Sequence, residues 1–258
     1  MLMQQLADYA IREQTSTLPP AVIHHAKRAV IDWYAALLPG SIVTPAILLE
    51  QAFAEDLDRG RARLASGRRA TLRAAALING AASHSVEFDD IYRDAGYHPG
   101  SPVISAALAA AQASGASGER FLRGVIVGYE ISTRIGEAVM PSHYKYWHTT
   151  GTVGAFGAAA AAATILGANR EQFMHALATV ASFASGLKQA FLSQAMTKPL
   201  HGGHAADAGC WAAMAAMKGV TGALDILEGE SGFSRNPVAC RILRSCSMNA
   251  PVWRLISW

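Results

Sequence analysis

The chain has 258 residues and a mass of 27.2 kDa, enough for one large domain or two modest ones with a sizeable buried core. Hydrophobic residues make up 51% of the sequence and charged residues 16%, so much of it is expected to lie in a core or a subunit interface. The formal net charge of +3 is small and the basic residues form no stripe, which argues against nucleic acid as a partner.

The sequence shows no sign of membrane insertion or export. No apolar run reaches the roughly 18 uncharged residues of a membrane span, and the N-terminal segment carries acids where a signal peptide would be apolar. The cysteines, Cys210, Cys240 and Cys246, form no CxxC pair, which is typical of a reducing compartment. We therefore expect a cytoplasmic protein with no membrane partner.

Helical periodicity runs through most of the chain. Apolar residues at helical spacing follow Pro19 and Pro20 until Pro39, and Ser117 and Asn169 are expected to cap later helices. Further helices are expected near 46–53, 71–79, 102–113, 119–139, 173–184 and 205–217, with a short strand at 61–66. The sequence predicts an all-α bundle of about eight helices that pack through small residues.

The composition changes after Phe233. The last segment, 234–258, has scattered arginines, two cysteines, two tryptophans and no amphipathic helix. We therefore divide the chain into a helical domain over residues 1–233 and an atypical tail over 234–258, which is expected to be truncated or foreign.

Three polar stretches interrupt the apolar pattern, and the first spans residues 84–100. It places Glu87, Asp89, Asp90 and Asp94 between two histidines, His84 and His98. One interpretation is a solvated loop whose carboxylates cap the next helix. A metal site is the second, although the spacing matches neither an EF-hand nor HExxH. Acid–base chemistry is the third, because carboxylates can position and tune an imidazole.

The other two polar stretches span residues 143–154 and 197–204. In the former, His148 precedes glycines that either allow close helix packing or leave a helix N-terminus open to a substrate carboxylate. In the latter, Lys198 and His201 flank a glycine pair, either as a plain loop between helices or as a cation presented to an anion.

Taken together, the order and the residues of these stretches resemble those of the MmgE/PrpD family, which includes 2-methylcitrate dehydratase, cis-aconitate decarboxylase and iminodisuccinate epimerase. The similarity runs from about Leu6 to Phe233. The matching motifs are His84–Asp90, His98–Gly100, Gly128–Glu130 with Arg134, His148–Gly154 and Thr197–Gly203.

The resemblance implies a helical domain whose cleft is closed by a smaller α+β lid, and the lid is expected to be missing here. It implies that Glu87, His98, His148 and Lys198 line one cleft, with no metal and no cofactor. His98 and His148 are the acid–base candidates, Lys198 clamps a substrate carboxylate and Glu87 orients an imidazole. Further substrate contacts are assigned to Asp90 and His201.

From this resemblance we expect a lyase or isomerase that acts on a di- or tricarboxylate, as 2-methylcitrate dehydratase does, by metal-free acid–base chemistry. The small-molecule polycarboxylate and a second copy in a homodimer are the expected partners. Without a lid, the activity of the chain by itself is expected to be impaired. The alternative is a non-catalytic helical dimerisation module or a truncated remnant. Glu87, where many members have aspartate, and Ile91, where several have threonine, leave the substrate open.

Overall fold

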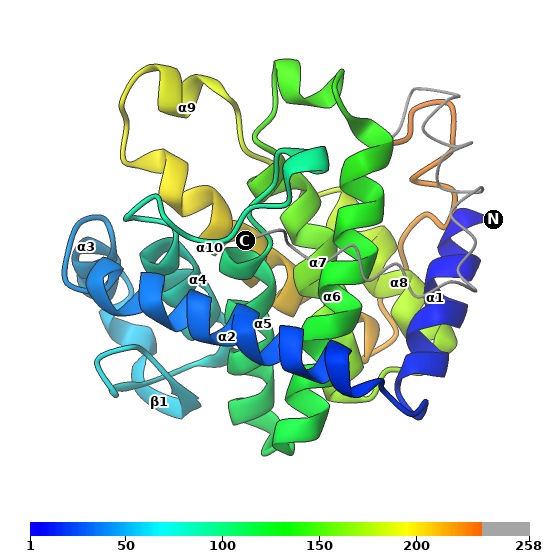
Figure 1. Ribbon diagram of the computed structural model, residues 1–258, viewed down its shortest axis with the longest axis horizontal. Helices are drawn as coiled ribbons and strands as arrows, with labels where there is room; N and C mark the ends of the chain where they lie inside the picture. The colour runs from blue at the N-terminus through cyan, green and yellow to red at the C-terminus, as the bar shows by residue number, and fades with distance from the viewer. Residues whose placement is uncertain (234–258) are drawn as a thin grey trace.

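The computed structural model describes residues 1–233, and the tail at 234–258 lies outside the described residues. Within that range the regular secondary structure is helical apart from one small hairpin (Figure 1), which confirms the all-α expectation. Its α-helices are α1 (Leu2–Glu13), α2 (Pro20–Gly40), α3 (Ala46–Ala52), α4 (Leu72–Ser83), α5 (Gly100–Ser114), α6 (Gly118–Val139), α7 (Thr149–Leu166), α8 (Arg170–Ala181), α9 (Gln189–Leu192) and α10 (Thr197–Ala216). Short 3-10 turns are η1 (Ala54–Asp56), η2 (Arg93–Ala95) and η3 (His143–Lys145).

Helix starts follow local side-chain chemistry. The hydroxyl groups of Thr71 and Ser117 accept hydrogen bonds from backbone N–H groups of the first turns of α4 and α6. Asn169 and Gln172 form a reciprocal capping box at the start of α8. The two predicted caps, Ser117 and Asn169, are thereby confirmed.

Two local expectations were wrong. The strand predicted at 61–66 begins earlier, as β1 (Leu57–Arg63), and pairs antiparallel with β2 (Arg69–Ala70). The 197–204 stretch was expected to be either a loop between helices or a turn that presents a cation. It instead forms the first turns of α10. Pro199 fits there because first-turn N–H groups have no partner within the helix.

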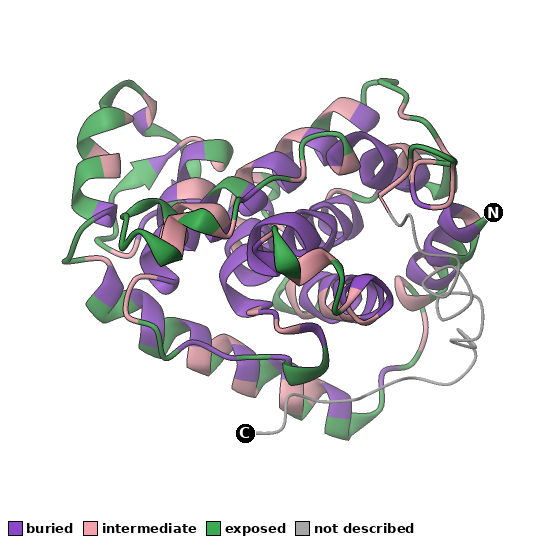
Figure 2. Cartoon of the chain, turned by 90° about the horizontal axis from the view of Figure 1, so that it is seen from above, coloured by how far each residue is buried: buried purple, intermediate pink, exposed green. Residues whose placement is uncertain are grey.

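The core surrounds α7, which packs against α5, α6, α8 and α10. The central helices are buried on nearly all sides, whereas α2 runs along the outside (Figure 2). In the described part of the chain, α7 alone has the length and hydropathy to cross a membrane. However, 94% of it is buried inside the domain, as in the core helix of a globular protein.

Glycines let three helices approach one another closely. A Cβ atom on Gly203 of α10 would lie 2.2 Å from the Leu77 carbonyl oxygen of α4, and one on Gly209 would lie 2.4 Å from the Cβ of Ala158 in α7. Neither position can hold a side chain without movement of backbone or core. The axes of α4, α7 and α10 are therefore tightly fixed relative to one another.

The direction of these helices decides which ends meet. Arg73 contacts Asp207 and Gly80 lies against Gly203, so α4 runs antiparallel to α10. Gly151 lies against His201, and α7 runs in the same direction as α10. As a result, the C-terminal end of α4 and the N-terminal ends of α7 and α10 come together at one place.

Candidate functional site

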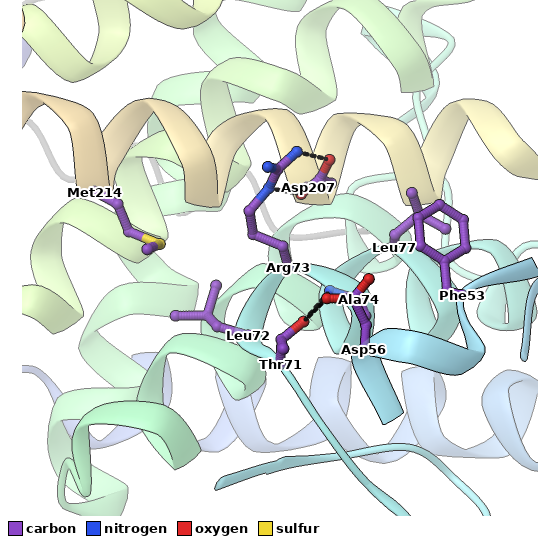
Figure 3. Close-up of a pocket in the computed structure, with 9 residues that line it drawn as sticks. All are labelled: Phe53, Asp56, Thr71, Leu72, Arg73, Ala74, Leu77, Asp207 and Met214. Carbon is purple, nitrogen blue, oxygen red and sulfur yellow. Dashed lines mark hydrogen bonds and ion pairs between the residues drawn. The ribbon is translucent and has the colours of Figure 1, made fainter. Parts of the chain in front are cut away.

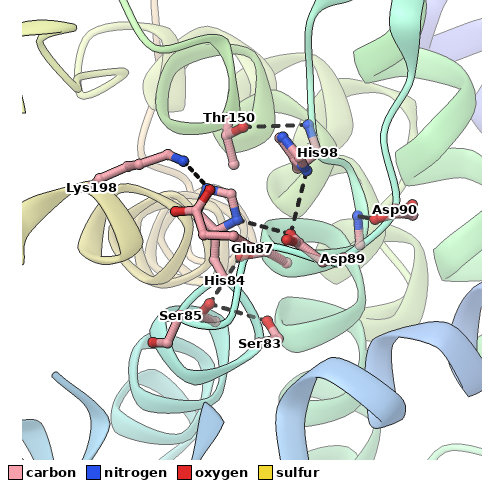
Figure 4. Close-up of polar contacts among 12 residues, drawn as sticks. Ser83, His84, Ser85, Glu87, Asp89, Asp90, His98, Thr150 and Lys198 are labelled. Atoms are coloured by element: carbon pink, nitrogen blue, oxygen red, sulfur yellow. Dashed lines mark hydrogen bonds and ion pairs between the residues drawn. The ribbon is translucent and has the colours of Figure 1, made fainter. Parts of the chain in front are cut away.

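The three polar stretches of the sequence meet where these helix ends come together (Figure 4). The loop that follows α4 carries His84 and His98, His148 is the residue before α7, and Lys198 and His201 lie in the first turns of α10. The loop is fastened to α7 by the His98 N–H, which donates to the Thr150 hydroxyl at 3.3 Å. The expected convergence of these stretches is thus what the structure shows.

Four imidazoles form one continuous cluster. The ring centroids of His84 and His98 are 5.0 Å apart, and His84 stacks on His148 at 5.6 Å with an interplanar angle of 19°. His148 also contacts His201, and their Nδ1 atoms are 3.0 Å apart. One of those two nitrogens must therefore donate a proton to the other.

The carboxylate that faces these imidazoles is Asp89. Its Oδ2 lies 2.8 Å from His84 Nδ1 and 3.6 Å from His98 Nδ1, and its side chain is 1% exposed. Burial alone would raise the pKa of Asp89, but the charge and hydrogen bond of His84, with help from His98, outweigh it and lower that pKa. Asp89 is therefore ionised in this site, and its interpretation as a solvated loop residue was wrong.

Glu87 does not contact an imidazole as its predicted orienting role requires. Its carboxylate instead pairs with the Lys198 ammonium, and 52% of its side chain is exposed. Glu87 adopts a φ of 60°, a left-handed conformation that costs an L-residue roughly 1–2 kcal/mol. Lys198 also lies 5.7 Å from the ring centroid of Phe191, so α9 forms a wall beside the ammonium.

Asp90 is buried on the other side of the loop. It accepts hydrogen bonds from the Gly100 N–H and the Tyr129 hydroxyl, each at 2.9 Å, while its own N–H donates to Asp32. Burial, reinforced by the charge of Asp89, raises the pKa of Asp90 to about 8. This geometry fits the positioning of the loop better than a substrate contact, and the predicted substrate contact remains a prediction.

Three of these imidazoles, those of His98, His148 and His201, are neutral near pH 7. Burial lowers the pKa of His148 to about 2 and that of His201 to about 4, and neighbouring imidazoles add to the effect. Burial also lowers the pKa of His98, which Asp89 only partly offsets. In the ligand-free site these rings are therefore proton acceptors rather than acids.

Donor atoms of His84, Asp89 and His98 all lie within 4.8 Å of one another, a spacing that a divalent ion could bridge. Imidazole and carboxylate together suit several such ions. The expectation of a metal-free, cofactor-free site therefore remains a prediction.

Two cavities lie near these helices. One of about 460 Å³ is lined by residues of the α9 region together with His201 and His204, so it reaches the imidazole cluster at His201. The other, of about 310 Å³, lies between α4 and α10 beside the Arg73–Asp207 ion pair (Figure 3). The Arg73 guanidinium already donates two hydrogen bonds to the Asp207 carboxylate.

Sequence reasoning assigned no role to His84 or Phe191, and it expected Glu87 rather than Asp89 beside the imidazoles. The sequence could have suggested the pairing of His84 with Asp89, because both lie in the same polar stretch, five residues apart. Their direct contact, however, depends on how the loop turns at Glu87. Phe191 carries no polar signal at all.

Comparison with known proteins identifies the family of this chain. The sequence model of the MmgE/PrpD N-terminal domain matches residues 4–239. Human cis-aconitate decarboxylase is 36% identical over 165 residues, covering 62% of this chain and 34% of its own length. The cis-aconitate decarboxylase-like protein oryM of Aspergillus oryzae is 28% identical, covering 88% of the chain and 49% of its own length. Cis-aconitate decarboxylase of Aspergillus terreus is also 28% identical, with 88% and 48% covered. The chain thus spans about a third to a half of the length of these curated relatives.

Proposed function

The chain belongs to the MmgE/PrpD family, and from that premise we propose that its helical domain binds a di- or tricarboxylate and carries the acid–base groups of a metal-free lyase. The observation that supports this most is the convergence of Lys198 with His98, His148 and His201 from three separate chain segments. An ammonium beside several imidazoles favours an anion that must also exchange protons.

The sequence by itself favoured an activity like that of 2-methylcitrate dehydratase. The curated relatives instead carry the name cis-aconitate decarboxylase. We therefore propose cis-aconitate as the first ligand and decarboxylation as the first reaction to test, with 2-methylcitrate and its dehydration second.

Lys198 is the proposed anchor for a substrate carboxylate. Its present partner is Glu87, which is half exposed and can turn toward water when a substrate carboxylate takes its place. An ammonium–carboxylate hydrogen bond in a partly buried site is stronger than a neutral one. His201, which lines the neighbouring cavity, is proposed as a second contact.

The imidazoles supply the proton transfers in this proposal. Loss of CO₂ breaks a C–C bond and leaves the electron pair on the organic fragment, so a proton must be delivered to carbon. His98 and His148 have lowered pKa values and are neutral before the substrate binds. Substrate carboxylates bring negative charge beside them and raise those pKa values. Substrate and a proton are therefore taken up together, and the resulting imidazolium is the acid.

Calorimetry of cis-aconitate binding to the 258-residue chain tests this proposal. Titrations in two buffers with different ionisation enthalpies should reveal proton uptake at pH 7. Lys198→Met should weaken binding by about tenfold to a hundredfold, the usual range for loss of a hydrogen bond to a charged group. Lys218→Met, an exposed lysine beyond the end of α10, is the matched control and should bind as the wild type does.

Failure to bind either carboxylate at millimolar concentration would contradict the proposed function. Turnover is a separate measurement, in which NMR spectroscopy follows the loss of cis-aconitate and the appearance of its decarboxylation product. Addition of a chelator should change neither binding nor turnover, and metal-dependent activity would overturn the metal-free mechanism.

A homodimer in the cytoplasm is also part of this proposal. Exposed apolar side chains, Ile31 and Leu38 of α2 and Ile42 just after it, support a subunit contact. The alternative function, a helical dimerisation module without catalysis, predicts the same dimer with no carboxylate binding. Light scattering at micromolar concentration tests the dimer, and a stable monomer would contradict it.

A further inference from the structure

His84 and Asp89 form a buried pair to which the proposed mechanism gives no role. The His84 side chain is fully buried and that of Asp89 is 1% exposed, and a hydrogen bond of 2.8 Å joins them. A buried carboxylate is costly unless its environment stabilises the charge. Such a pair next to two proposed acid–base residues needs an explanation.

The pair contacts both proposed acid–base residues. Asp89 Oδ2 is 3.6 Å from His98 Nδ1, slightly too long for a hydrogen bond, and that nitrogen is buried without a partner. On its other side, the His84 ring stacks on His148 almost in parallel. Catalytic hydrogen bonds are often long in ligand-free sites and shorten when the substrate binds.

Neighbouring carboxylates are less suited to this task. The Glu87 carboxylate is engaged by Lys198, and that of Asp90 by Gly100 and Tyr129. In Figure 4 the dashed lines join Asp89 to His84 and to His98, whereas Glu87 is joined to Lys198. Asp89 is therefore positioned to serve two rings at once.

We propose that Asp89 and His84 are a positioning pair for the acid–base residues, a role that rests on the proposed function of His98 and His148. The Asp89 carboxylate accepts a hydrogen bond from the Nδ1–H of His84 and a second one from the Nδ1–H of His98. His84, held in this way, fixes the ring plane of His148 by stacking. Neither residue of the pair touches the substrate.

The consequence for His98 is a fixed tautomer. With its Nδ1 proton directed at the Asp89 carboxylate, the lone pair of Nε2 is left free to take a proton. When Nε2 gains one, the resulting imidazolium is stabilised by the same carboxylate, as in catalytic triads. The other charged groups beside this ring, Lys198 and the Glu87 that pairs with it, lie on the substrate side.

Asp89→Asn tests the proposal, with ¹⁵N–¹H correlation spectra of the imidazoles as the readout. In the wild type, His84 and His98 should each show a single tautomer protonated at Nδ1. In Asp89→Asn both should become mixtures, and cis-aconitate binding should weaken by about tenfold, with an unchanged circular dichroism spectrum. Glu87→Gln is the matched control and should leave both tautomers unchanged.

Unaltered tautomers in folded Asp89→Asn would overturn the proposal. A second variant, His84→Phe, keeps the stacked ring but gives Asp89 to His98 alone, so the His98 Nδ1 proton should exchange with water more slowly. Unchanged exchange of that proton would also count against the pair.

Two further outcomes separate this inference from the proposed function. Tautomers that respond as expected in a chain that binds no carboxylate would overturn the function and leave the positioning contacts standing. Stoichiometric binding of Zn²⁺ that is lost in Asp89→Asn would instead identify the three residues as a metal site and overturn the positioning role.

Discussion

The interface along α4, α7 and α10 and the cluster at the ends of the same helices are built in opposite ways. Along the interface, Gly203 and Gly209 remove side-chain volume so that backbones touch. At the ends, large polar side chains pack together. His84 stacks on His148, and Lys198 pairs with Glu87. The same three helices therefore carry both close backbone packing and a cluster of polar side chains.

This difference shows how the site is kept in place. Polar groups in a low-dielectric site function only when their geometry is fixed, and loops alone rarely fix it. Here the geometry of the polar groups is fixed by close-packed helix backbones, which cannot shift in small steps. Variants that loosen the interface should therefore cost stability, while variants in the cluster should mainly change charge and binding.

The largest expected effect comes from filling the interface. In Gly203→Ala the new methyl group would meet the Leu77 carbonyl oxygen, so α10 must move away from α4. We expect the free energy of unfolding to fall by about 3 kcal/mol, the upper part of the usual range for overpacking. Denaturant titration measures this change. Gly118→Ala, which meets no neighbour within 4 Å, is the control and should be near neutral.

A Gly203→Ala chain as stable as the wild type would mean that the interface is looser than the structure indicates. Carboxylate binding in this variant should also weaken, because α10 carries Lys198 and His201.

An intermediate effect is expected from the charge state of Asp90. Its pKa is raised to about 8 in the folded chain, so the folded state holds a proton that the unfolded state loses near pH 4. Stability from this group is present at low pH and is lost as the pH rises toward 8. Unfolded histidines still lose protons above pH 6.5 and act in the opposite direction, whereas Glu130, whose pKa is raised to about 7, adds to the loss. The Asp90 contribution is therefore measured as the difference between the wild type and Asp90→Asn, in which the other groups cancel.

Between pH 6.5 and 8.5 we expect the free energy of unfolding of the wild type to drop by about 2 kcal/mol relative to that of Asp90→Asn, since one pKa unit corresponds to about 1.4 kcal/mol. The variant lacks this decline because asparagine is neutral throughout. Below pH 6.5 the lowered pKa values of His148 and His201 have the opposite effect, and the free energy of unfolding decreases as the pH falls. A steeper decline in Asp90→Asn would refute the assignment.

The smallest effect on stability is expected at Lys198. Its partner Glu87 is half exposed, and partly exposed ion pairs contribute about 0–1 kcal/mol. Lys198→Met should therefore unfold within about 1 kcal/mol of the wild type, measured by the same denaturant titration. A loss as large as that of Gly203→Ala would show that Lys198 supports the fold and would remove the contrast between the two regions.

Much of this organisation was predictable from sequence. The caps at Ser117 and Asn169 act within one turn, so neighbouring residues suffice to identify them. The convergence of His98, His148 and Lys198 was predictable only through the resemblance, because helical periodicity does not fix how helices are arranged relative to one another. The start of α10 at Thr197 was not predictable, because its two glycines favour a loop until α4 packs against them.

By itself, the sequence determined an all-α fold, the order of its polar motifs and the residue types available for acid–base chemistry. Only the tertiary structure decided that Asp89, and not Glu87, faces the imidazoles. The reason is local geometry combined with long-range packing. Glu87 takes a left-handed conformation that redirects the loop, and the helices behind it leave one buried position for a carboxylate between His84 and His98. Spacing along a chain does not encode which of two neighbouring side chains points inward.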